Sequence, residues 1–368
     1  MRISFILFLF ILVSDACVER INIDAPKALS DQLVIEGLIT DEPGPYTVKL
    51  SRATNVNETL VRTRPVSAVK VVISDNLGNS ETLKEIEIGT FQTDTNGIQG
   101  VIGRSYTLHV ETNDGKVYES TPETIVPAGT IENIRFKFET SQPENNTTQY
   151  GFRFFIDAKG DAQTNNLLRW KFSGIYKVVT YPEQHTEPMG EGRVPAPRAC
   201  SGYVYDKTAG LAKVGPCTCC ECWTSAVDSQ IKLSDNQTIV AEEFRDIEVG
   251  FLSISYWTYE KTLVEIKQMS LSQSAFDYWK TIKDQKDGAS SLFQPSIGKA
   301  RTNIFVKNGS DEVQGLFYAS AIATKSVFIT PSDLPQGLKL SFDAPPPITE
   351  SCIQAFKNST TKKPYDWE

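Results

Sequence analysis

The feature that most constrains this fold is a set of short runs in which apolar and polar residues alternate. Side chains of a β-strand point to opposite faces in turn, so such runs predict strands with one buried face. The runs are Tyr46, Val48 and Leu50; Val69, Val71 and Ile73; and Tyr106, Leu108 and Val110. Because turn formers at 42–45, 75–78 and 113–115 separate them, we expect an immunoglobulin-like β-sandwich over residues 32–126.

A second β-rich domain is expected over residues 127–345, after a linker bracketed by Pro122 and Pro127. Further strands are predicted at 150–156, 168–172, 247–259 and 263–269. One amphipathic helix stands out, with Ser272 as its cap and Gly288 at its end. We interpret its apolar stripe as core packing rather than a ligand site; the stripe contains Ala275, Phe276, Trp279 and Ile282.

Residues 1–16 have the features of a lipoprotein signal peptide. Arg2 precedes an apolar run over 3–13, which is shorter than the roughly 20 residues that cross a bilayer. Ala16 stands directly before Cys17, so we expect cleavage there, a lipid on Cys17 and a tether over 17–31. The alternative is an ordinary secretory cleavage nearby with Cys17 free, and Asp15 is atypical for a lipoprotein. We expect no transmembrane helix elsewhere.

Length and charge restrict the class of protein further. A chain of 368 residues is long enough for two domains. The net charge of -8 and the lack of a basic stripe argue against a nucleic-acid partner.

Several segments resemble domain of unknown function 4249, a family of Bacteroidota outer-membrane lipoproteins. The most specific is 33–51 (LVIEGLITDEPGPYTVKLS), which looks like the family's opening strand pair. The others are 96–108 (NGIQGVIGRSYTL), 114–120 (DGKVYES), 268–272 (QMSLS) with Tyr278 and Trp279, and 315–320 (GLFYAS). The C-terminal tail, 346–368, is similar to the family's usual ending, although Tyr365 stands before Asp366.

The resemblance implies a setting rather than a mechanism. Such proteins are similar in setting to the lipoprotein partners of TonB-dependent transporters. The resemblance therefore implies a lipid anchor on the outer membrane, with the protein on the periplasmic or the surface face. It also implies a TonB-dependent barrel as a possible partner. The family offers no catalytic residues to transfer to this chain, and no cofactor is expected.

The cysteines are unusually crowded. If Cys17 carries lipid, six of the seven cysteines remain: Cys200, Cys217, Cys219, Cys220, Cys222 and Cys352. An even number in an exported chain favours disulfides, and six cysteines allow 15 pairings. Because a bond between neighbours is strained, we expect Cys219 and Cys220 to pair elsewhere and Cys352 to tie the tail to this cluster. The alternative is a thiolate site for Cu(I) or Zn(II), although the C-x-C-C-x-C spacing is unusual for zinc.

The same segment is the best candidate for interaction with a ligand or partner. Prolines and glycine flank it at 195–197 and 215–216, which indicates an exposed, cross-linked loop over 200–223. Tyr203 and Trp223 are the candidate contact residues, because exposed aromatic rings stack well on ligands.

Catalytic patterns are not found in the sequence. The two histidines, His109 on a polar strand face and His185 in a loop between Glu183 and Glu187, are interpreted as ordinary surface residues. Asp157 and Asp161 flank a Lys-Gly pair, and a tight hairpin is favoured there over a calcium site. Three glycines, Gly97, Gly100 and Gly103, precede a predicted strand, so turn formation is favoured over phosphate binding.

Three hypotheses for function follow. The first is a non-enzymatic accessory or substrate-binding lipoprotein of a TonB-dependent transporter. The second is a stand-alone surface module that binds glycans or peptides. The third, a hydrolase with an unrecognised site, is disfavoured because no nucleophile motif is present and histidine is scarce.

Overall fold

The structure is a computed structural model, and it describes residues 31–53, 63–141, 148–228, 230–234, 242–288, 299–365 and 367. The expected mainly β fold with one longer helix is confirmed. The signal peptide, Cys17 and most of the expected tether lie outside the described residues. Asp31, at the end of that tether, already donates its backbone N–H to Ala53.

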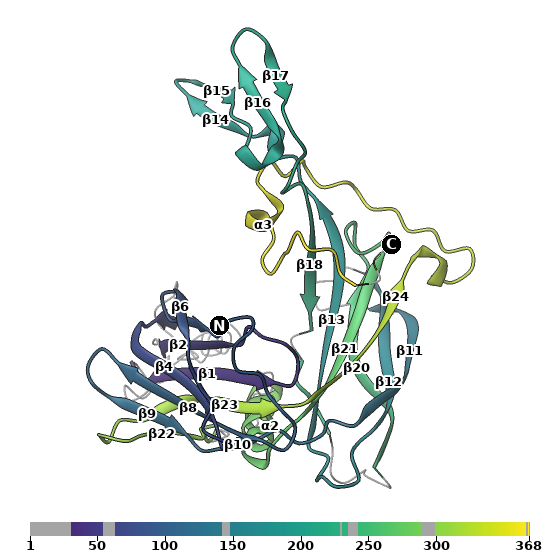
Figure 1. The fold of residues 1–368 in the computed structure, drawn as a ribbon. Helices are drawn as coiled ribbons and strands as arrows, with labels where there is room; N and C mark the ends of the chain where they lie inside the picture. Colours follow the sequence, from purple (N-terminus) through teal and green to yellow (C-terminus); the bar gives the residue numbers. More distant parts are fainter. Residues whose placement is uncertain are drawn as a thin grey trace, which may run out of the picture.

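The N-terminal unit is a sandwich of two sheets, each with six strands (Figure 1). One sheet contains β1 (Leu33–Thr40), β2 (Thr47–Ala53), β3 (Thr63–Pro65), β6 (Lys84–Glu87), β7 (Thr90–Gln92) and β23 (Val313–Ser320). The other contains β4 (Ala68–Asp75), β5 (Ser80–Thr82), β8 (Ser105–Thr112), β9 (Val117–Ser120), β10 (Glu123–Thr124) and β22 (Ile304–Val306). The alternation of β1 and β8 buries Ile35, Leu108 and their neighbours between the sheets.

The N-terminal sandwich also contains two strands, β22 and β23, from residues 304–320. The expected division into domains at 32–126 and 127–345 is therefore corrected, because part of the second range belongs to the first unit. β23 pairs in parallel with β1, from Leu33 opposite Val313 to Thr40 opposite Ser320. β22 pairs with β9 in the second sheet. At Gly315 the backbone has φ of +101°, and a Cβ would collide with the carbonyl of Ile35. Glycine is therefore required for this pairing.

The second unit also packs two sheets against each other. The first contains β11 (Thr130–Ser141), β12 (Gln149–Lys159) and β20 (Glu243–Ser253). The second contains β13 (Leu168–Val179), β18 (Glu221–Val227), β19 (Lys232–Leu233), β21 (Thr262–Ser270) and β24 (Ile322–Ile329). Phe154 and Phe172 meet across the core with ring centroids 5.2 Å apart.

Two local expectations are corrected. Val69 is 62% exposed, because the register of β4 against β8 shifts between Ala68 and Lys70. A bulge of this kind turns one residue away from the buried face. The strand expected at 247–259 ends at Ser253 in β20, and a turn follows.

The expected linker is packed rather than free. Glu123 is 2% exposed and accepts hydrogen bonds from Ser272, Ser274 (2.6 Å) and Asn303 (2.9 Å). Burial raises the pKa of Glu123, while these three donors oppose that rise. Residues 122–127 therefore join the two units through a buried polar contact.

The described residues contain one longer helix and several short ones. α2 (Gln273–Gly288) begins as expected, with the Ser272 hydroxyl accepting from the N–H of Ala275 at 3.2 Å. It lies beside β23 (Figure 1). The others are η2 (Pro182–Gln184), η3 (Ala199–Ser201), η4 (Pro331–Asp333) and α3 (Cys352–Ala355). Within the described ranges, no helix has both the length and the apolar character that a membrane span requires.

Two hairpins project beyond the second unit (Figure 1). They are β14 (Thr186–Met189) with β15 (Gly192–Pro195), and β16 (Tyr203–Asp206) with β17 (Gly210–Lys213). Both lie in the chain between β13 and β18, which pair from Ser173 opposite Val227 to Val179 opposite Glu221. The hairpins thus extend from the far end of this strand pair.

Candidate interaction site

Three disulfides fix the base of the paired hairpins. They join Cys200 to Cys219, Cys217 to Cys220, and Cys222 to Cys352. The paired Cα atoms are 5.7, 5.8 and 5.8 Å apart, within the usual range for a disulfide. As expected, Cys219 and Cys220 have different partners and Cys352 ties the tail to the cluster. Since these six cysteines are all paired, none of them is a thiolate that could hold a metal.

Polar contacts at the same base hold the tail against the hairpins. The guanidinium of Arg198 donates to both carboxylate oxygens of Glu350, at 2.9 and 2.7 Å. These hydrogen bonds keep the pKa of Glu350 below its usual value. His185 is only 9% exposed, with its Nδ1 3.3 Å from Glu350. The expectation that His185 lies on an open surface loop is therefore wrong, because the tail covers it.

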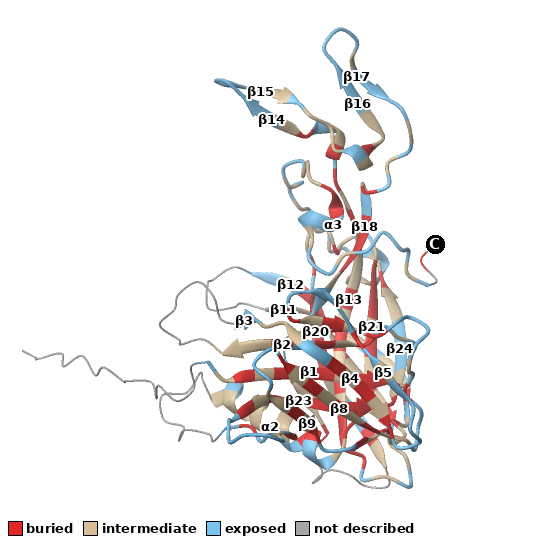
Figure 2. Cartoon of the chain, turned by 60° about the vertical axis from the view of Figure 1, so that its left-hand side comes forward, coloured by how far each residue is buried: buried red, intermediate tan, exposed pale blue. Residues whose placement is uncertain are grey.

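The outer parts of the hairpins are exposed (Figure 2). Large apolar side chains on them reach solvent: Met189 (58%), Val204 (48%), Tyr205 (40%), Leu211 (45%) and Val214 (66%). Apolar surface gathered on a projecting element is typical of a contact site for another molecule. Such an arrangement provides contact area held in one conformation; it brings no reacting groups together.

The expected role of Trp223 as an exposed stacking residue is wrong. Trp223 is 9% exposed and packs edge-to-face against Trp367, with ring centroids 6.2 Å apart. Its backbone also exchanges two hydrogen bonds of 2.9 Å with Thr360. The tail therefore turns Trp223 into a core residue. Tyr203 begins β16 with a half-buried side chain, and its role in binding stays a prediction.

An aromatic groove lies beneath the hairpins and was missed by the sequence analysis. It encloses about 780 Å³ between the end of β13, the turn after β20 and the proline-rich tail. Its walls include Tyr181, Tyr256, Trp257, Tyr259 and the prolines at 345–347. The sequence signal was the cluster of three aromatic residues within 256–259, which had been assigned to a strand.

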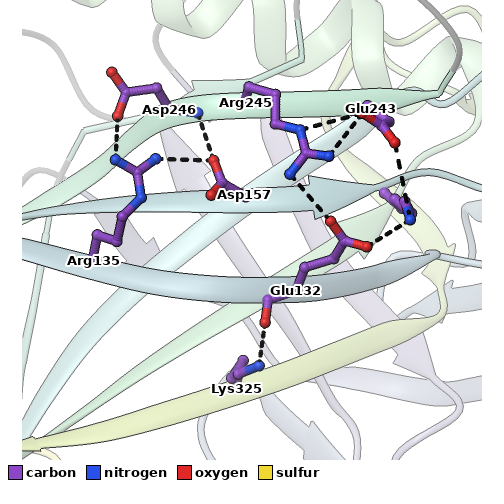
Figure 3. Close-up of polar contacts among 8 residues, drawn as sticks. Glu132, Arg135, Asp157, Glu243, Arg245, Asp246 and Lys325 are labelled. Carbon is purple, nitrogen blue, oxygen red and sulfur yellow. Dashed lines mark hydrogen bonds and ion pairs between the residues drawn. The ribbon is translucent and has the colours of Figure 1, made fainter.

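Asp157 and Asp161 do not converge on a common site. Asp157 accepts from Arg135 at 2.9 Å and from the backbone N–H of Asp246 at 3.0 Å (Figure 3). These contacts lower the pKa of Asp157, with the backbone hydrogen bond contributing most. Asp161 instead accepts from the N–H of Gln163 at 2.9 Å in the following turn. The hairpin interpretation of this segment agrees with that geometry.

The same face of the sheet carries further ion pairs. The carboxylate of Glu132 pairs with the guanidinium of Arg245 at 3.4 Å (Figure 3). The ammonium group of Lys325 donates a hydrogen bond to the backbone carbonyl of Glu132. Arg245 also pairs with Glu243 at 2.8 Å. Exposed pairs of this kind contribute about 1 kcal/mol or less, so this network has a minor effect on stability.

The remaining sequence candidates are ordinary structural residues. His109 lies half-buried on β8, opposite Glu119 of β9 and on the face away from the core. Gly97, Gly100 and Gly103 lie in the loop that precedes β8, and Gly103 has φ of +87°. Among the described residues, no three His, Cys, Asp or Glu side chains are grouped to hold a metal ion.

The fold and the site together define a class: a mainly β protein of two packed units with a disulfide-bonded pair of projecting hairpins. The chain belongs to the family described as domain of unknown function (DUF4249), whose model matches residues 18–326, most of the chain. The resemblance found in the sequence is thereby confirmed. No curated protein is similar enough to this chain to match it.

Proposed function

We propose that this chain is a non-enzymatic accessory lipoprotein, anchored through Cys17 to an outer membrane, whose paired hairpins dock on a partner protein. The observation that carries the proposal is the projecting hairpin pair, cross-linked at its base and carrying several exposed apolar side chains. A segment held rigid before binding loses little conformational entropy when it docks. Two of the disulfides, Cys200–Cys219 and Cys217–Cys220, supply that rigidity.

The partner we propose is a TonB-dependent outer-membrane barrel. Three disulfides are compatible with an exported protein, since they persist in oxidising compartments. The outer-membrane location and the choice of partner in this proposal are inferred from the similarity in setting between this family and lipoproteins that accompany such transporters. Docking through the hairpins would place the contact surface far from the N-terminal sandwich, which follows the anchor in the chain.

The experiment is affinity purification of the tagged chain from its native membrane in mild detergent, with mass spectrometry of the bound proteins. Three variants are compared with the parent. Val204→Asp and Leu211→Asp place a charge on the hairpins, at side chains that are 48% and 45% exposed. Ile86→Asp is the matched control, because it changes a 54% exposed apolar residue on β6 of the N-terminal sandwich.

The parent and Ile86→Asp should recover a TonB-dependent barrel in near-equal amount. The two hairpin variants should recover at least about tenfold less, since a buried charge without a partner costs several kcal/mol. If the parent is recovered alone, the transporter proposal is wrong. If all three variants recover the barrel equally, the hairpins are not the docking surface.

A second candidate function is supported by the aromatic groove. Tyr181 and Tyr256 are both 42% exposed there, and aromatic rings of this kind stack on sugar rings or peptide side chains. A stand-alone binding module should bind glycans or peptides as a purified chain without any transporter. Tyr256→Ala should then weaken binding, whereas the hairpin variant Leu211→Asp should leave it unchanged.

A further inference from the structure

A cavity lies at the junction of the two units, away from both the hairpins and the aromatic groove. It is open to solvent, has a volume of about 260 Å³ and is lined by residues of β1, β2 and β23 from the sandwich, β13 from the second unit, and α2. Figure 1 shows α2 beside β23 at this junction. Neither unit forms the cavity alone.

The cations in the cavity are placed there by the alternation of β13. Leu168, Trp170 and Phe172 point into the core of the second unit. Arg169 and Lys171 must then point to the opposite face of the sheet, which is normally solvated. Here α2 and the sandwich cover that face, so both cations become partly buried.

Arg169 is held against an aromatic wall. Its guanidinium carbon lies 3.6 Å from the centre of the Trp279 ring, a favourable cation–π arrangement. The guanidinium also interacts with the hydroxyl of Tyr318. Its Nε is buried and has no hydrogen-bond partner within the described part of the chain. A buried N–H without an acceptor is costly, but this Nε is closed off from solvent, so a ligand in the cavity meets the guanidinium of Arg169 only through its other nitrogens.

Lys171 adds a second positive charge. Burial, with a smaller effect of the neighbouring cations Arg169 and Lys267, lowers the pKa of Lys171 to about 8. The side chain therefore stays mainly protonated at pH 7. Lys49 and Glu36 also line the cavity, so its charged groups are three cations and one anion. This excess of positive charge stands out in a chain whose net charge is -8.

The other walls carry apolar and polar groups together. Leu38, Leu316 and the Trp279 ring are apolar, and Thr47 and Tyr318 add hydroxyl groups. A multiply charged phosphate ligand would face the carboxylate of Glu36. A singly charged group attached to an apolar body matches both parts of the cavity. The volume is below the 300–1,000 Å³ typical of drug-sized ligand sites, so the ligand part that enters must be small.

We propose that this junction cavity binds the carboxylate of a small ligand with an apolar or aromatic body. The carboxylate accepts from the guanidinium of Arg169 and from the ammonium group of Lys171, and the apolar body packs against Trp279 and Leu38. The carboxylate comes either from a free acid or from the C-terminal residue of a peptide. Since the walls come from both units, a bound ligand also ties the units together.

The test uses the full-length chain in a mild non-ionic detergent and isothermal titration calorimetry. The probes are 3-phenylpropionate and its uncharged amide, with the intrinsic fluorescence of the five tryptophans, Trp279 among them, as a second readout. Lys171→Met removes one charge and keeps the length of the side chain. The matched control is Lys283→Met, on α2, where the ammonium group pairs with Asp287 at 2.7 Å outside this cavity.

The carboxylate should bind at least about tenfold more tightly than the amide, as expected when a charged hydrogen bond is lost. Lys171→Met should weaken carboxylate binding by a similar factor, and Lys283→Met should not change it. Gly-Gly-Phe with a free and an amidated C-terminus distinguishes the two sources. Binding of the free peptide as well as the acid indicates a chain terminus, and binding of the acid alone indicates a small molecule.

Three outcomes overturn the proposal, two from the probes and one from the variant. One is equal binding of acid and amide; the other is no heat and no fluorescence change for either acid or peptide at millimolar concentration. Carboxylate binding that Lys171→Met leaves unchanged also contradicts it, because the charge would then lie elsewhere. None of these results depends on the partner proposed for the hairpins.

Discussion

Gln268 is the residue whose replacement should reveal most about how the second unit is held together. Its side chain is completely buried on β21. The amide oxygen accepts from the indole N–H of Trp170 at 2.8 Å. The amide nitrogen donates to the carbonyl of Ala128 at 2.6 Å and to that of Lys159 at 3.0 Å. One side chain thus joins β13, β12 and the segment between the units.

Gln268→Met keeps the size of the side chain and removes all three hydrogen bonds. The indole N–H of Trp170, which is itself 2% exposed, then has no acceptor. An unsatisfied buried donor costs about 1–3 kcal/mol, and each abandoned carbonyl adds about 1 kcal/mol. We therefore expect the second unit to lose about 4 kcal/mol, a large part of the 5–15 kcal/mol typical of a folded domain.

Native-state hydrogen exchange read by mass spectrometry is the suitable assay, because it reports the opening of each unit separately. Amides of β12, β13 and β21 should exchange about a thousandfold faster, the equivalent of about 4 kcal/mol. Gln273→Met, which removes an exposed hydrogen bond to Asp277 on α2, is the control. If the two variants differ by less than about 1 kcal/mol, this account of the buried amide is refuted.

Four further predictions concern the disulfides, the tail and the junction cavity. Replacing Cys222 and Cys352 by alanine opens a bridge with sequence separation 130, which should cost about 5 kcal/mol in the chain-entropy model; urea unfolding measures the loss. The bridge with sequence separation 3 should contribute about 2 kcal/mol in the same assay. Trp367→Ala should cost about 3 kcal/mol and increase hydrogen exchange around Trp223, because it empties a buried aromatic site. Burial lowers the pKa of Lys171 from 10.5 to about 8, so the unfolded chain binds more protons between those values. Lys171→Met should therefore raise the free energy of unfolding at pH 7, and that advantage should shrink as the pH rises from about 8 towards 10.5.

The cysteine cluster shows how far local chemistry carries a prediction. The expectation that Cys219 and Cys220 pair with different partners followed from the strain of a bond between neighbours, and the structure agrees. The choice among 15 pairings needed the path of the chain. Cys352 reaches Cys222 only because the tail returns along β18, where Thr360 meets Trp223.

The sequence by itself determined where several strands lie and, for most of their residues, which face is buried. Alternation placed Leu108 and Val110 inward and His109 outward, because successive side chains of a strand point to opposite sides. Local hydrogen bonding determined the start of α2 at Ser272. These features depend on residues that are neighbours in the chain. They can therefore be predicted without knowing which strands and helices pack against each other.

Only the tertiary structure decided which of the outward faces are covered. Alternation indicates on which strand face Trp223 and Arg169 lie. It does not show that the tail covers Trp223, or that α2 covers Arg169. Likewise, nothing local in 313–320 indicates that this strand closes the N-terminal sandwich beside β1. The contacts that make a residue buried, paired or available to a ligand come from segments far apart in sequence, and folding alone brings them together.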